Sequence, residues 1–112
     1  MLTIEAGRTR RRLGPYEYEK EKGIPRDIRT PACFKNGNVY IGEWSDKNRR
    51  HGKGTLYQKD GGIYEGYWTD GHRTGRGRAI FPNGEAYDGD WKNDKRHGSG
   101  VFHAYTGALY EG

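Results

Sequence analysis

The stretch that decides the fold is Tyr40-Ile-Gly-Glu-Trp44, because the chain returns to it at a fixed interval. Its further copies are Tyr64-Glu-Gly-Tyr-Trp68, Tyr87-Asp-Gly-Asp-Trp91 and an incomplete copy, Tyr110-Glu-Gly112. The tyrosines that begin the four copies are spaced by 24, 23 and 23 residues. A period of this length is typical of repeat proteins, in which each unit is one small supersecondary structure that stacks on its neighbours.

Two glycine motifs keep the same period and divide each unit into two strands and two turns. The first motif occurs as Gly52-Lys-Gly54, Gly75-Arg-Gly77 and Gly98-Ser-Gly100. The second occurs as Asn36-Gly37, Asp60-Gly61, Asn83-Gly84 and Thr106-Gly107. Because both central residues of a type I′ turn have positive φ, Asn36-Gly37 is expected to form such a turn. The first unit has one extra residue between Trp44 and Gly52, which we expect to lengthen a turn without changing the strand register.

The aromatic residues of a unit are predicted to share one face of the sheet. Side chains alternate along a strand, so Tyr87 and Trp91 point the same way. Pairing this strand with the next sets the rings against Gly98-Ser-Gly100, where the glycine backbone leaves room for a flat ring. The other face carries mostly polar side chains, such as Glu43 and Lys53, which we expect to pair across the hairpin. The sequence therefore predicts one aromatic face and one solvated face.

Together these motifs resemble the MORN repeat (membrane occupation and recognition nexus), whose pattern joins Tyr-x-Gly-x-Trp to His-Gly-x-Gly and then Asp/Asn-Gly. His51-Gly52-Lys53-Gly54 and His97-Gly98-Ser99-Gly100 match the second motif, whereas the second unit has Thr74 in place of histidine. The resemblance covers residues 32–112, about three and a half units. It implies an all-β, elongated, single-layer antiparallel meander of hairpins with a groove along it. We expect about seven or eight strands and no α-helix within residues 34–112.

The chain divides into an N-terminal arm, residues 1–31, and the repeat sheet, residues 32–112. The arm is basic and highly charged, and Gly14-Pro15 and Pro31 interrupt it. We therefore expect it to be irregular, extended or disordered alone, and ordered against a partner. Because Gly112 falls three residues into a unit, we also expect either a longer parent chain or an edge strand that pairs with another chain.

Composition limits the core to aromatic rings. Of the 112 residues, 31% are hydrophobic and 19 are glycine, while nine are tyrosine and three are tryptophan. The single cysteine, Cys33, excludes a disulfide within the chain, and we expect it to be a small buried apolar residue in a reducing compartment. There is neither an apolar run of membrane-spanning length nor a secretory signal, so we expect an intracellular, cytoplasmic protein.

The charge is mildly basic, with a formal net charge of +5. Residues 1–30 hold eight basic and five acidic side chains, and residues 31–112 hold twelve and ten. The repeats are therefore nearly balanced, and the excess does not require a nucleic-acid partner.

No group of residues has the spacing of a catalytic or metal site. His51, His97 and His103 are the candidate bases, but the first two recur at a repeat position, which favours a role in the turn. Cysteine and histidine do not cluster at metal-ligand spacing. Gly75-Arg-Gly77 lacks the third glycine of a dinucleotide fingerprint. We therefore predict no enzyme activity, no cofactor and no metal.

Two candidate binding surfaces remain. The first is a partner groove along the aromatic face, formed by Tyr40, Trp44, Tyr64, Trp68, Tyr87 and Trp91. Tyrosine and tryptophan dominate binding hot spots, and a single-layer sheet is expected to leave part of such a row exposed. Successive tryptophans should lie roughly 10 Å apart, close to two helical turns, so the groove fits a helical partner segment anchored on Trp68.

The second surface is a basic edge made by the turns that follow each tryptophan. Its residues are Lys47, Arg49, Arg50, His72, Arg73, Lys95 and Arg96. Such a stripe could meet anionic phospholipid, although Asp46, Asp70 and Asp94 interrupt it. The arm adds a basic cluster that we expect to extend the partner contact: Arg8, Arg10, Arg11 and Arg12.

These surfaces leave three hypotheses for the function. The favoured one is a non-enzymatic scaffold that binds other protein subunits in a cytoskeletal or ciliary assembly through the aromatic groove. The second is a membrane-tethering module at a membrane–cytoskeleton junction, which binds anionic phospholipid through the basic edge. The third is a regulatory repeat region of a larger enzyme. Members of the resembled family share an architecture and differ in function, so fold alone does not choose among them.

Overall fold

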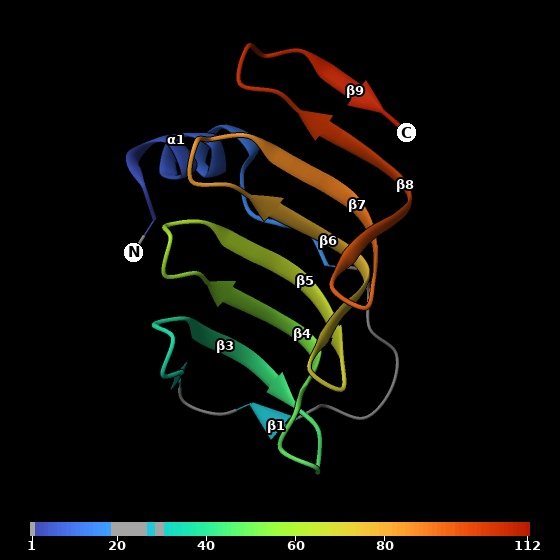
Figure 1. The fold of residues 1–112 in the computed structure, drawn as a ribbon. Helices are drawn as coiled ribbons and strands as arrows, with labels where there is room; N and C mark the ends of the chain where they lie inside the picture. Colours follow the sequence, from blue (N-terminus) through green and yellow to red (C-terminus); the bar gives the residue numbers. More distant parts are fainter. Residues whose placement is uncertain (1, 19–26, 29–30) are drawn as a thin grey trace.

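The computed structural model describes residues 2–18, 27–28 and 31–112, which form one open antiparallel sheet with a helix on one face (Figure 1). The sheet has nine strands in the order β1-β3-β4-β5-β6-β7-β8-β9, with β2 beside β3. The elements are α1 (Ile4–Leu13), β1 (Asp27–Ile28), β2 (Ala32–Cys33), β3 (Val39–Trp44), β4 (Arg50–Tyr57), β5 (Ile63–Thr69), β6 (His72–Ile80), β7 (Ala86–Lys92), β8 (Lys95–His103) and β9 (Leu109–Glu111). The predicted all-β meander is confirmed, since residues 34–112 hold seven strands and no helix.

Each unit is one hairpin, and glycines face each other at its centre. Gly66 of β5 pairs with Gly77 of β6, and the register then shifts before Trp68, as it does at the same place in the other two hairpins. A Cβ on Gly77 would overlap the Tyr64 ring, because the ring lies flat over this backbone. The predicted coupling between aromatic and glycine motifs is therefore confirmed.

The type I′ turn predicted at Asn36-Gly37 is not found there. Asn36 keeps a negative φ and accepts the Asn38 N–H on its side chain at 3.0 Å, so only Gly37 (φ 93°) is left-handed and the turn is not type I′. Two-residue turns with both φ values positive lie instead between the strands of a hairpin: Asp70 (49°) and Gly71 (86°) between β5 and β6, and Asn93 (49°) and Asp94 (68°) between β7 and β8. There the connection is short enough to need the type I′ twist.

The extra residue of the first unit lies in the β3–β4 turn, as predicted. Trp44 still faces Arg50, as Trp68 faces Arg73 in the second hairpin, so the insertion leaves the register unchanged. The longer turn closes with the Ser45 N–H donating to the Arg49 carbonyl at 2.8 Å.

The prediction of an irregular arm is wrong over residues 4–13, which form α1. Thr3 caps the helix by accepting the Ala6 N–H on Oγ1 at 3.1 Å, and Gly14 (φ 81°) ends it. A ten-residue helix is marginal in water by itself. This one is stabilised because it packs on the sheet, so residues 4–13 are ordered against their own chain.

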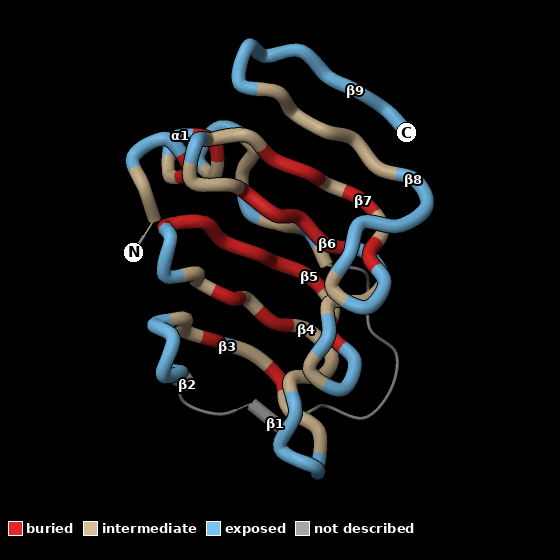
Figure 2. The backbone as a smooth tube through the Cα atoms, viewed as in Figure 1, coloured by how far each residue is buried: buried red, intermediate tan, exposed pale blue. Residues whose placement is uncertain are grey.

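The helix covers the face of the sheet opposite the aromatic row. Ala6 packs on Ile63, Ile80 and Ala86, all fully buried, and these three alternate with residues of the aromatic side. Figure 2 shows the buried stretches along β5, β6 and β7, where both faces are covered. The prediction of a solvated face is therefore wrong under α1. No helix in the described ranges is long and apolar enough to span a membrane.

Candidate functional site

The six aromatic residues of the predicted groove form one continuous ladder. Trp68 meets Tyr64 of its own unit at 5.2 Å between ring centroids and Tyr40 of the preceding unit at 5.5 Å, both edge to face. Trp91 repeats this with Tyr87 at 5.4 Å and with Tyr64 at 5.2 Å. Edge-to-face pairs add to the free energy of burial, so the ladder couples each hairpin to the next.

The ladder is a core and not an open groove. Tyr40 and Tyr64 are 0% exposed and Trp68 is 2% exposed, with Tyr87 and Trp91 also buried. Only Trp44 among the six is partly exposed. The expected partial exposure of the row is thus limited to Trp44. The other five rings are buried because the tyrosines lie on glycine backbone and arginines cover Trp68 and Trp91. A binding role for this face stays a prediction.

The polar groups of five rings donate to backbone carbonyls inside the sheet: those of Tyr40, Tyr64, Trp68, Tyr87 and Trp91. The Tyr40 hydroxyl donates to the Glu43 carbonyl at 2.7 Å, where the strand bulges, and the Trp68 indole donates to the Gly54 carbonyl at 3.2 Å. Burial raises the pKa of the Tyr40 hydroxyl, and the Glu43 carboxylate raises it further. The phenol therefore stays a neutral donor across the physiological range.

The predicted basic edge separates into structural and exposed residues. The Arg50 guanidinium lies 4.7 Å from the centre of the Trp68 ring and donates to the Gly71 carbonyl at 3.0 Å. Arg73 repeats this, 4.8 Å from the Trp91 ring centre and 2.9 Å from the Asp94 carbonyl. Burial lowers the pKa of the Arg50 guanidinium. One regularity of the sequence could have indicated this structural role: an arginine follows each repeat tyrosine after nine or ten residues.

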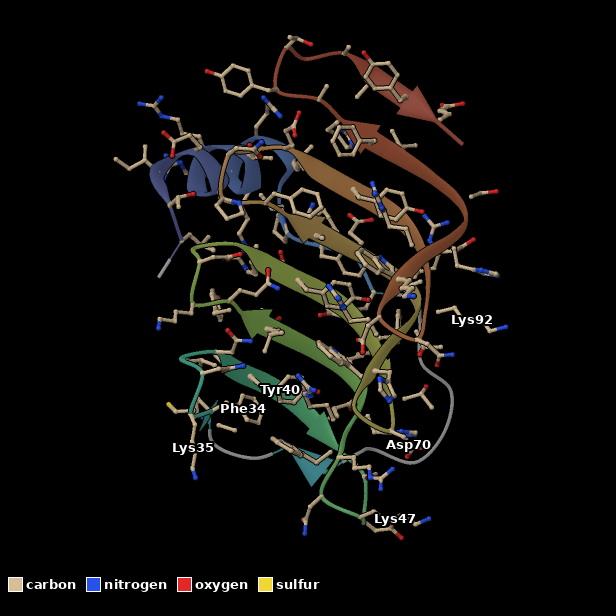
Figure 3. The ribbon with its side chains drawn as sticks, in the orientation of Figure 1. Phe34, Lys35, Tyr40, Lys47, Asp70 and Lys92 are labelled. Atoms are coloured by element: carbon tan, nitrogen blue, oxygen red, sulfur yellow. The ribbon has the colours of Figure 1, made fainter. Side chains whose placement is uncertain are left out.

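The exposed members of the edge are Lys47, Arg49, His72, Lys95 and Arg96. Figure 3 shows Lys47, Asp70 and Lys92 on the turn side of the sheet, where these hairpin ends lie. His72 is held by Asp94, with Nδ1 and Oδ2 2.8 Å apart, so the acidic turn residues neutralise part of the stripe. His51 accepts the Asp70 N–H at 3.3 Å, which agrees with the predicted turn role.

Asp94 joins two units at this edge. Its carboxylate accepts the Arg73 backbone N–H at 2.8 Å and contacts the Arg73 guanidinium at 3.3 Å. Partial burial acts to raise the pKa of Asp94, but the hydrogen bonds from Arg73 and His72 and the charge of Arg73 outweigh it and leave the pKa lowered. The carboxylate is thus stabilised in its charged form.

On the opposite face, an ion triad around the buried Glu65 carboxylate fixes α1 to the sheet. Arg10 donates to both oxygens of Glu65, at 3.3 Å each, and Arg78 donates to Glu65 at 3.2 Å and to the Gly14 carbonyl at 2.7 Å. The side chains of Glu65 and Arg78 are 6% and 5% exposed. Strand alternation places both residues on the face that was expected to be solvated, and nothing in the sequence pattern indicated this network.

The remaining predicted residues lie as follows. Arg10 of the arm cluster points at the sheet, whereas Arg8, Arg11 and Arg12 are exposed on α1. Glu43 accepts the Lys53 backbone N–H at 2.6 Å. Cys33 is exposed, so its predicted burial is wrong; it lies in the short strand β2, which pairs only with β3.

Fold and site together define a repeat protein whose successive hairpins share one aromatic core. The MORN repeat model matches residues 40–63, 64–86 and 87–108, and the chain belongs to the MORN-repeat family. The unit boundaries at Tyr40, Tyr64 and Tyr87 are the predicted ones. MORN repeats are in general non-catalytic modules that interact with proteins or membranes.

Among curated proteins, the chain is similar to MORN repeat-containing protein 3 of Xenopus laevis. The two are 42% identical over 90 residues, which cover 74% of this chain and 37% of the frog protein. Alsin of Rattus norvegicus and alsin of Homo sapiens are each 35% identical over 79 residues, 66% of this chain and 5% of alsin. The chain thus spans a minor part of the length of these relatives.

Proposed function

We propose that this chain is a non-enzymatic scaffold module that binds other protein subunits in a cytoskeletal or ciliary assembly in the cytoplasm. The observation that carries the proposal is the continuous ring ladder, in which Trp68 and Trp91 each join two units. It makes one stiff body, 42 Å in its longest dimension, from three hairpins. A stiff, elongated body with charged groups on several surfaces suits the positioning of partners.

The exposed surface supports protein as the partner. Around the ladder the sheet exposes Ile41 (42%) at one end and Tyr105 (76%) and Leu109 (62%) at the other. Basic side chains stand exposed along the turn edge and on α1. Mixed apolar and charged surface of this kind is common at interfaces between proteins.

Cross-linking tests this proposal, because exposed lysines lie on the turn edge. Chemical cross-linking of the native complex from ciliated cells should join Lys47, Lys92 or Lys95 to subunits of a cytoskeletal or ciliary assembly. Links spread without preference over unrelated soluble proteins would contradict a scaffold function.

One observation favours a second candidate, binding to anionic membranes. Lys47, Arg49, Lys95 and Arg96 are exposed at the hairpin turns, and basic clusters attract anionic lipids. The test is flotation of the chain with phosphoinositide-containing vesicles, with the charge-reversal variant K47E/R49E/K95E as control. Flotation that this variant abolishes would favour the membrane, and no flotation would leave the protein-binding scaffold as the better account.

A further inference from the structure

Resting on the proposed scaffold function, we propose that α1 and its flanks form a docking groove for an acidic amphipathic helix of a protein partner. The groove runs along one flank of α1, next to the side that packs on the sheet, since Leu2 contacts the apolar cluster under α1 and Arg10 binds Glu65. Its lining residues are Leu2, Gly7, Arg10, Arg11, Gly14 and Pro15.

The arginines of α1 divide between two tasks. Arg10 is committed to Glu65 of the sheet, and this hydrogen bond raises the pKa of the Arg10 guanidinium. Arg8, Arg11 and Arg12 are exposed, and none has an ion-pair partner among the residues that the structure describes. Residues three and four apart lie on one side of a helix, so these three guanidinium groups form one basic patch.

The groove has room for side chains of a partner. Its volume is about 420 Å³, and a Cβ built on Gly7 would meet nothing within 4 Å. Leu2 and Pro15 supply apolar surface at its two ends, and Arg11 is exposed beside it. A partner helix can approach the bare backbone at Gly7 closely, bury an apolar residue there, and place its carboxylates on the arginines.

The sheet holds this groove in a fixed geometry. Thr3 donates to the Pro82 carbonyl and Thr9 to the Gly84 carbonyl, each at 2.6 Å, so α1 is fastened to the β6–β7 turn. The Thr3 N–H also donates to the Gly61 carbonyl at 3.0 Å, which fastens it to the β4–β5 turn. A helix that is ordered before binding loses little conformational entropy when the partner docks.

The chemistry of the groove selects among occupants. A second copy of this chain would bring its own α1 arginines against the patch and be repelled. A flat membrane surface would leave the hollow beside Gly7 unfilled. An acidic amphipathic helix satisfies both features, since carboxylates form paired hydrogen bonds with arginine and an apolar side chain fills the hollow.

The test uses the full chain and a fluorescent helical peptide of two heptads, with leucines on one face and glutamates beside them; a twin peptide has lysines for the glutamates. We expect the acidic peptide to bind and the basic twin not to. The variant R8E/R11E/R12E should weaken binding at least about tenfold. The matched variant K47E/R49E/K95E, with the same change in charge at the turn edge, should change it less than about twofold.

A second pair of variants separates the groove from charge alone. Gly7→Ala adds a Cβ for which there is room and should bind within about twofold of the natural chain, whereas Gly7→Leu fills the hollow and should weaken binding at least about fivefold. Far-ultraviolet circular dichroism and thermal unfolding check that each variant is folded.

Three results would overturn the inference: no binding of the acidic peptide, equal loss in both triple variants, or binding of anionic vesicles that R8E/R11E/R12E abolishes while the peptide is ignored. The scaffold proposal stands or fails separately, on whether lysines of the turn edge cross-link to subunits of an assembly. A partner that binds elsewhere would leave that proposal intact and overturn only the groove.

Discussion

Trp68 of the second unit donates its indole N–H to the carbonyl oxygen of Gly54 in the first unit, at 3.2 Å. Trp91 makes the same bond to Gly77 one unit later, at 3.1 Å. Trp68 and Trp91 are thus each fixed by the glycine strand of the unit before, and these units cannot complete their cores alone. This dependence is expected of repeat proteins, where stability comes largely from contacts between neighbours.

Replacing the central glycine tests this packing. Gly77→Ala puts a Cβ into the Tyr64 ring, which is fully buried and confined in the core. We expect a loss of at least about 2 kcal/mol in the free energy of unfolding, as for overpacked cores. Urea denaturation measures it, and a loss below about 0.5 kcal/mol would mean that the ring is free to move aside.

The buried hydroxyls should be measurable one at a time. Tyr40→Phe removes the donor to the Glu43 carbonyl, and we expect a loss of about 1 kcal/mol. Tyr105→Phe is the matched control, because Tyr105 is 76% exposed and should change stability by less than about 0.3 kcal/mol. Equal effects of the two substitutions would show that the Tyr40 bond contributes nothing.

Two glycines of the helical segment should respond to alanine with opposite signs. Gly7→Ala should stabilise the protein by about 0.5–1 kcal/mol, because the added Cβ has free space and alanine favours helix. Gly14→Ala should destabilise it by about 1 kcal/mol, because Gly14 has φ 81° at the end of α1. Thermal unfolding of both variants checks the signs, and a stabilising Gly14→Ala would argue against the helix end.

Acid should weaken the link between the second and third units. The pKa of Asp94 is lowered in the folded chain from its ordinary value of 3.8, so its contribution is present above that value and is lost as the pH falls through the lower, folded pKa. Asp94→Asn should therefore flatten the fall of the unfolding free energy below pH 3.8. A steeper fall of the unfolding free energy in the variant would show that the folded state does not favour the charged form of Asp94.

The repeat could be predicted from the sequence because each motif carries its own physical reason. A ring that lies flat on the backbone requires glycine beneath it, because any Cβ would overlap the ring. The tyrosine and glycine positions represented by Tyr64 and Gly77 therefore recur together in every unit. The exposure of the row could not be predicted, since burial depends on arginines that reach across from the neighbouring unit, as Arg50 does over Trp68.

The helix shows a different limit. Thr3, Glu5 and Gly14 are the start and stop signals of a helix, and they were readable beside the arginines. The helix is stabilised by tertiary contacts, which these signals do not reveal. Ile63, Ile80 and Ala86 lie far from α1 in the sequence and form the apolar surface on which it packs. Most residues on the face under α1 are polar, so the strand pattern indicates a solvated face. The three apolar residues lie at the strand ends, where the alternation alone does not mark them as a binding surface for a helix.

Hydrogen exchange of the indole N–H groups, followed by nuclear magnetic resonance with and without the acidic peptide, tests whether the aromatic row is a closed core. We expect the Trp68 and Trp91 indoles to exchange only through global unfolding, and saturating peptide to leave their resonances in place while those of α1 shift. Rapid exchange of these indoles, or large shifts of their resonances on binding, would show that the aromatic row opens as the partner groove and would contradict the account.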